Sequence, residues 1–81
     1  MTKAYVAALA HQIGTAVRAH RKAASLTQKE LADLAEIGKT AVFDIEAGKQ
    51  TVRLATLFRV LHVLNIRLRL DSPLEKRGHE E

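Results

Sequence analysis

Apolar residues recur at helical spacing through most of the chain and change to strict alternation near its C-terminal end. Over residues 3–23 the recurring positions are Val6, Leu9, Ile13, Ala16 and Val17. This spacing predicts one long helix with an apolar stripe. Gly14 interrupts the helix at a cost of about 1 kcal/mol relative to alanine. Either another helix packs closely at that point, or the true boundary of the helix falls near it. We expect residues 1–10 to form an N-terminal helical extension.

Two short helices follow. Thr27 stands at a cap position with Glu30 three residues on, which is the pattern of a capping box, so a helix begins at Gln28. A turn over residues 36–38 leads to a second helix, from Lys39 to about Ala47. The inward positions are Leu31, Leu34, Ala35, Val42 and Ile45. Two helices joined by so short a turn cross at a large angle, which is the layout of a helix-turn-helix.

The last helix covers residues 54–65 and is the most hydrophobic part of the chain. Its main stripe is Leu54, Leu57, Phe58, Leu61 and Leu64, which we expect to complete the core. Val60 and Val63 lie on a second face. Because nothing in a single chain is left to cover that face, we expect it to contact another subunit.

Residues 66–70 alternate between apolar and basic side chains, which predicts a half-buried strand. A lone strand leaves its backbone donors and acceptors unpaired. We therefore predict a two-fold homodimer with antiparallel strands lying over the last helices of both subunits; an extended tail without a partner is the alternative. The predicted interface residues are Val60, Val63, Ile66, Leu68 and Leu70. Residues 72–81 contain the only proline and mostly charge, which predicts a disordered tail.

Composition narrows the class of protein. The 81 residues suffice for one small domain, and 13 Lys and Arg against 9 Asp and Glu give a net charge of +4, which favours an anionic partner: DNA, RNA or an anionic membrane. The absence of cysteine excludes disulfides and thiolate zinc sites. Apolar runs are far shorter than the roughly 18 residues that cross a bilayer, so we expect a cytoplasmic protein. The four histidines are scattered, and no catalytic constellation is apparent. We expect neither an enzyme nor a metal or cofactor site.

Three segments carry a family resemblance: RAHRKAASLTQKELA, IEAG, and TVRLATLFRVLHVLNIRLRL. In this order they resemble the lambda-repressor-like Xre regulators, and among these the chain is most similar to HipB-type antitoxins. The resemblance implies a mainly α domain of four to five helices over residues 11–71, with the C-terminal strand pairing across a homodimer. Glu36 and Ser25 stand where the family usually has glycine, and a left-handed backbone there costs about 1–2 kcal/mol.

The resemblance also implies which residues contact DNA. The helix beginning at Lys39 is similar to the helix that enters the major groove. Lys39 would donate to guanine, Thr40 would meet a thymine methyl or a base amine, and Asp44 would accept from cytosine N4. The other expected DNA contacts are Gln28 on a phosphate, Lys49 and Arg53 on the backbone further along, and Phe43, for which packing on a neighbouring element is the alternative.

The resemblance implies a structural role for Arg21 and Glu46, because a salt bridge joins these two positions in the family.

Two recognition helices about 34 Å apart suit a palindromic operator. The sequence thus predicts a dimeric, operator-binding transcriptional repressor. Its resemblance to HipB-type antitoxins implies a HipA-like kinase toxin as a further partner and repression of its own operon. A phage- or plasmid-type regulator without a toxin, and a protein-interaction module that keeps the helix-turn-helix as scaffold, are the alternatives.

Overall fold

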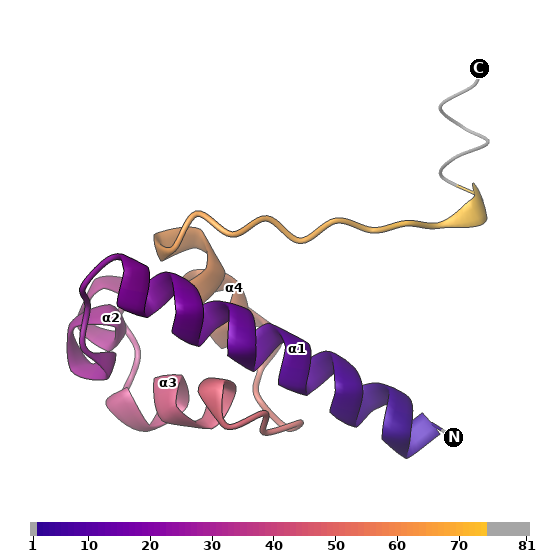
Figure 1. Cartoon of the computed structure of the whole chain (residues 1–81), viewed down its shortest axis with the longest axis horizontal. Coiled ribbons are helices and arrows are strands. Elements are labelled where there is room, and N and C mark those ends of the chain that lie inside the picture. The colour runs from indigo at the N-terminus through magenta and orange to yellow at the C-terminus, as the bar shows by residue number, and fades with distance from the viewer. Residues whose placement is uncertain (1, 75–81) are drawn as a thin grey trace.

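The computed structural model describes residues 2–74, which form a mainly α domain (Figure 1). The helices are α1 (Thr2–Ala23), α2 (Gln28–Ala35), α3 (Lys39–Glu46) and α4 (Leu54–Val63). The mainly α prediction is therefore confirmed, with four helices and no strand between residues 2 and 74. None of these helices combines the length and the apolarity that crossing a membrane requires.

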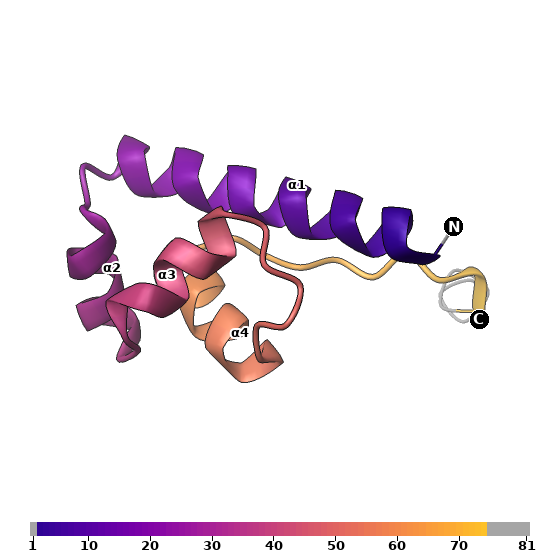
Figure 2. The ribbon, with the colours of Figure 1, turned by 90° about the horizontal axis from the view of Figure 1, so that it is seen from below.

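Gly14 lies in the middle of one continuous helix. Its position is buried, and a Cβ added there would collide with the carbonyl oxygen of Ile45 and lie 2.9 Å from that of Glu46. Of the two alternatives, close packing of another helix is therefore the right one. Since α1 begins at Thr2, residues 2–10 are its first turns, and they project past the end of α3 (Figure 2).

The core lies where α2 packs against α3 and α4, and where α1 packs against α3. The largest fully buried side chains are Val17, Leu31, Val42 and Val60, one from each helix. Ala32 and Ala35 are also buried, and their small side chains let the neighbouring helices approach α2 closely. The core is therefore shared by all four helices and fixes the angle between α2 and α3.

The face that α4 buries differs from the prediction. Val60, expected at a dimer interface, is completely buried inside the chain, whereas Leu54 and Phe58 of the expected core stripe are 67% and 47% exposed. Because α4 is apolar almost all round, its periodicity does not select one face. Packing against α2 and α3 selects it. Val60 is therefore removed from the predicted dimer interface. Leu34, also expected in the core, is 60% exposed.

Within residues 2–74, three residues other than glycine have a left-handed backbone, each just after a helix: Ser25 (φ 58°), Glu36 (φ 60°) and Asn65 (φ 59°). Ser25 and Glu36 are the two residues that stand where the regulators that this sequence resembles usually have glycine. The N–H of Ile37, directly after Glu36, donates to the carbonyl oxygen of Ala32 at 3.0 Å. This bond closes α2 and turns the chain sharply toward α3.

Residues 66–72, which we call the arm, leave the body as extended chain (Figure 1). The N–H of Ile66 donates to the carbonyl oxygen of Leu61 at 2.8 Å, which anchors the arm at the end of α4. Further along, Leu68 is 55% and Leu70 83% exposed. Residues 66–70, predicted as a strand, therefore have no strand partner within the described chain. Residues 75–81 of the predicted tail lie outside the described residues.

Candidate nucleic-acid interface

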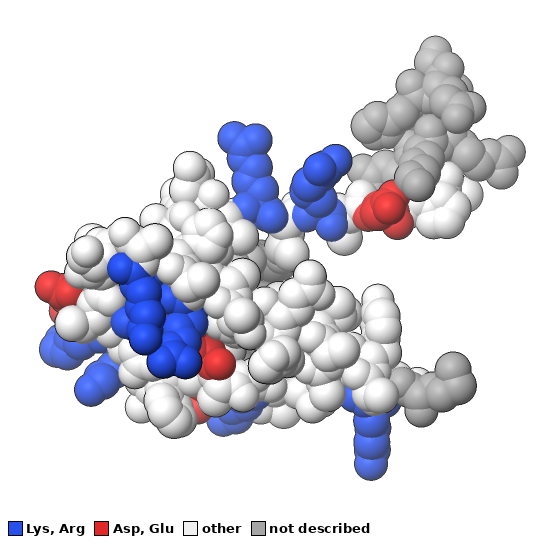
Figure 3. All heavy atoms as spheres, viewed as in Figure 1, with Lys and Arg blue, Asp and Glu red and all other residues white. Residues whose placement is uncertain are grey.

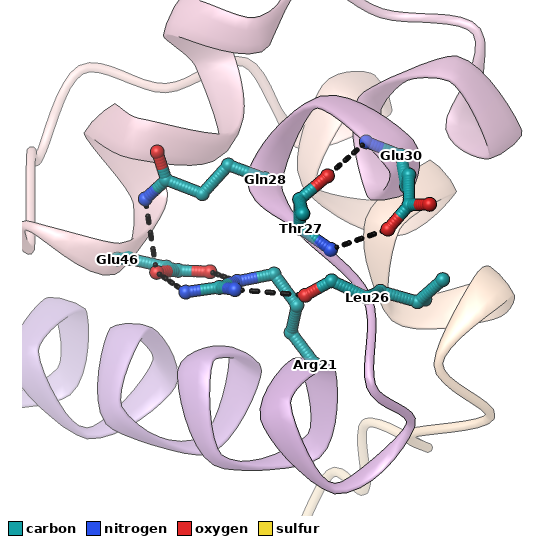
Figure 4. Close-up of polar contacts among 6 residues, drawn as sticks. All are labelled: Arg21, Leu26, Thr27, Gln28, Glu30 and Glu46. Atoms are coloured by element: carbon teal, nitrogen blue, oxygen red, sulfur yellow. Dashed lines mark hydrogen bonds and ion pairs between the residues drawn. The ribbon is translucent and has the colours of Figure 1, made fainter.

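A capping box fixes the start of α2, as the sequence predicts. The Thr27 hydroxyl accepts from the N–H of Glu30 at 3.0 Å, and the Glu30 carboxylate accepts from the N–H of Thr27 at 2.8 Å (Figure 4). The first N–H groups of α2, beginning with that of Gln28, lie at the helix end that carries partial positive charge. Such an end suits a phosphate group.

Arg21, Gln28 and Glu46 tie three helices together (Figure 4). Arg21 donates to both carboxylate oxygens of Glu46, at 2.6 and 3.0 Å, and to the carbonyl oxygen of Leu26 at 2.9 Å. The amide nitrogen of Gln28 donates to the same carboxylate at 3.1 Å. The side chains of Arg21 and Glu46 are only 11% and 6% exposed. The network therefore fixes the ends of α1 and α3 relative to the start of α2.

The network also shifts the ionisation of its members. Burial by itself raises the pKa of Glu46, but the hydrogen bonds from Arg21 and Gln28, with the nearby charges of Arg21 and Arg18, outweigh burial and lower this pKa below its ordinary value. The hydrogen bond to Glu46 raises the pKa of Arg21. Both groups are therefore held in their charged forms.

Helix α3 presents its first turn to solvent. Its N-cap, Gly38, supplies no capping side chain, and Lys39 and Thr40 are exposed. Lys39, Thr40 and Phe43 line one open hollow together with Gln28 at the start of α2. Four of the seven predicted DNA contacts, from two helices, therefore lie around one hollow.

The other three predicted contacts are arranged differently. Asp44 is partly buried, and its carboxylate accepts a hydrogen bond from the Lys49 ammonium at 3.4 Å. A contact of either group with DNA would have to replace this partly exposed pair. Arg53 is exposed at the N-cap of α4, beyond the loop that follows α3.

Arg18, near the end of α1, belongs with this surface. It lines a second hollow with Gln28 and Phe43, so the two hollows adjoin. A sequence signal existed: Arg18 stands three residues before Arg21, on the same face of α1. Lys and Arg side chains gather at this end of α1, at the left of Figure 3, and other basic side chains project from the arm.

A second, apolar surface lies between α4 and the arm. An open groove is lined by Phe58, Leu61, His62, Ile66, Leu68 and Leu70. It contains three of the predicted dimer contacts, and a fourth, Val63, is partly buried at the end of α4. In Figure 1 the arm and α3 lie on opposite sides of α1, so this groove and the two hollows lie on different sides of the molecule.

Two short helices at a fixed angle, the second with an open N-terminal turn, define a helix-turn-helix domain. The family model described as Helix-turn-helix, HTH_3, matches residues 17–70, and the chain belongs to this family. The chain is also 38% identical over 65 residues to the uncharacterised HTH-type transcriptional regulator y4mF of Sinorhizobium fredii, a match that covers 80% of this chain and 86% of that protein.

Proposed function

We propose that the protein is a sequence-specific DNA-binding transcriptional repressor that acts as a homodimer on a palindromic operator. One observation carries the proposal: Gln28, Lys39, Thr40 and Phe43 line one open hollow at the exposed start of α3. The name of the similar protein, a transcriptional regulator, and the net charge of +4 agree with it.

The contacts follow from the chemistry of the side chains. Lys39 donates to guanine O6 and N7, and Thr40 contacts the next base edge in the major groove. Gln28 and the open N–H groups at the start of α2 hold a backbone phosphate, with Arg18 on the same side. Lys49, in the loop after α3, and Arg53, at the end of that loop, contact further phosphates. Asp44 contacts cytosine N4 if its pair with Lys49 opens.

The arm supports dimerisation. Its exposed apolar residues and the groove against α4 lack a cover within the described chain. The arm of a second copy, paired antiparallel, supplies that cover and satisfies the backbone groups of both arms. Ile66, Leu68 and Leu70 then face the α4 helices of both subunits, with Val63 at the edge. A two-fold dimer sets two α3 helices on successive major grooves.

The segment from Thr51 to Leu70 supports a finer proposal, because it resembles the corresponding part of HipB-type antitoxins. On this proposal the dimer also binds a HipA-like kinase toxin and represses an operon that encodes both proteins. A kinase-like gene beside this one, whose product copurifies with the full chain, is the expected finding. A chromosomal neighbourhood without such a gene leaves the protein a regulator without a toxin.

The test of DNA binding uses the full chain and its own promoter. Lys39→Ala and Thr40→Ala should each weaken binding by about 1–3 kcal/mol and relax the preference at one base pair per half-site. Lys29→Ala is the matched control, because Lys29 is 67% exposed and paired with Asp33 within α2. Equal effects of Lys29→Ala and Lys39→Ala would contradict base reading by Lys39.

A further inference from the structure

Phe43 has an unusual environment for a large apolar side chain. It is 58% exposed, and the other side chains that line its first hollow, from Gln28, Lys39 and Thr40, are all polar. In the adjoining hollow it lies with Arg18 and the Arg21–Glu46 pair. Packing on a neighbouring element, the alternative that the sequence left open, therefore does not describe this residue. Its apolar surface faces outward among groups suited to DNA.

We infer that Phe43 contacts the C5 methyl group of a thymine in the major groove, so that the operator requires a thymine at one position in each half-site. This inference rests on the proposed DNA binding and specifies one base that is read. Thymine is the base that presents an apolar group in the major groove, and phenylalanine is among the side chains that contact it.

The position of Phe43 on α3 supports a contact with a base. Phe43 stands four residues after Lys39 and three after Thr40, so the three side chains share one face of the helix. A helix that inserts its first turn into the groove places Phe43 one turn further along the same groove wall. Gln28 lines both of the hollows that Phe43 lines, and Arg18 lines one of them, so both side chains are then near the backbone that flanks the thymine.

A second copy of the chain is the other candidate cover for Phe43. The proposed dimer contact uses the arm, however, and the arm and α3 lie on opposite sides of α1 in Figure 1. The dimer therefore leaves Phe43 open, and DNA is the partner that reaches it.

The experiment replaces each thymine of a bound operator half-site in turn by deoxyuridine, which keeps the base-pair hydrogen bonds and removes only the methyl group. One position should bind the wild-type chain about fourfold more weakly, since burying one methyl is worth about 0.8 kcal/mol. At that position, 5-methylcytosine should bind more tightly than cytosine, because it restores a methyl at the same place in the groove.

The Phe43→Ala variant should bind the thymine and deoxyuridine operators equally. The Tyr5→Ala variant is the matched control, because Tyr5 is an aromatic residue 66% exposed at the far end of α1, and it should keep the fourfold difference. Specific DNA binding without a methyl-sensitive thymine, or equal methyl sensitivity in Phe43→Ala and wild type, overturns the inference alone. Absence of sequence-specific binding overturns the proposed function and the inference together.

Discussion

Glu46 accepts hydrogen bonds from α1 and α2 while it ends α3, so three helices depend on one carboxylate. Removing one partner of a buried ion pair leaves the other charge without compensation. We predict that Glu46→Ala lowers the free energy of unfolding by about 3–5 kcal/mol, measured by urea denaturation. Asp33→Ala is the control, because its pair with Lys29 is exposed and should be worth less than about 1 kcal/mol. Equal stability of the Glu46→Ala variant and the wild type would contradict the role of the network.

Because of the same carboxylate, we predict that the stability of the fold depends on pH. Its lowered pKa means that the unfolded chain binds the proton more tightly than the folded chain does. The stabilisation is complete above the unfolded pKa of about 4.3 and is lost as the pH falls through the lower folded value. Unfolding followed between about pH 6 and pH 3 should show a decline in stability that is shallower in Glu46→Gln. Parallel profiles of the two proteins would show that Glu46 does not cause the decline.

Among single residues, the contacts that the sequence predicts best are the local ones. Thr27 and Glu30 are three residues apart, so their capping box is encoded in the spacing and forms as predicted. Arg18 and Phe43 were harder to assign, because their neighbours come from other helices. The hydrogen bond between Asp44 and Lys49 was also not foreseen, since it depends on the path of the chain after α3.

At the scale of the helices, α1 and α3 approach each other closely at Gly14. A methyl group there would meet two backbone oxygens, which cannot rotate away as a flexible side chain can. We predict that Gly14→Ala destabilises the protein by about 2–3 kcal/mol, although alanine favours a helix. Gly38→Ala is the control, because a Cβ there has nothing within 4 Å. In thermal unfolding, the stability of this variant should differ from that of the wild type by less than about 1 kcal/mol. Similar melting of the two variants would contradict this close contact.

The order and approximate limits of the helices followed from the sequence, because caps and periodicity are properties of short segments. The face that α4 buries did not follow. Leu54, Phe58 and Val60 all fit an apolar helix, and only packing against α2 and α3 decides that Val60 enters the core. The alternation of apolar and basic residues likewise predicted the extended form of the arm, whereas the proposed pairing of the arm would involve a second chain and so cannot follow from the pattern alone.

At the scale of the whole molecule, we predict that dimerisation through the arm and DNA binding are coupled. Leu68→Glu places a charge in the groove between the arm and α4 and should shift the chain from dimer to monomer in sedimentation velocity. The variant should also bind the operator more weakly, because one half-site is then held without the other. Arg67→Ala, on the other face of the arm, should leave the dimer intact. A dimer that survives Leu68→Glu would exclude the arm as its main contact.

Whether this helix-turn-helix domain recognises a DNA sequence can be measured by comparing two DNA duplexes across a range of salt. The affinity of the full chain for its own promoter and for a shuffled duplex is measured from about 50 to 200 mM salt. We predict tighter binding to the promoter throughout, with a steep linear fall of log affinity against log salt as phosphate contacts release counterions. Equal affinity for both duplexes across that range, or no binding to either, would show that the domain does not recognise a DNA sequence.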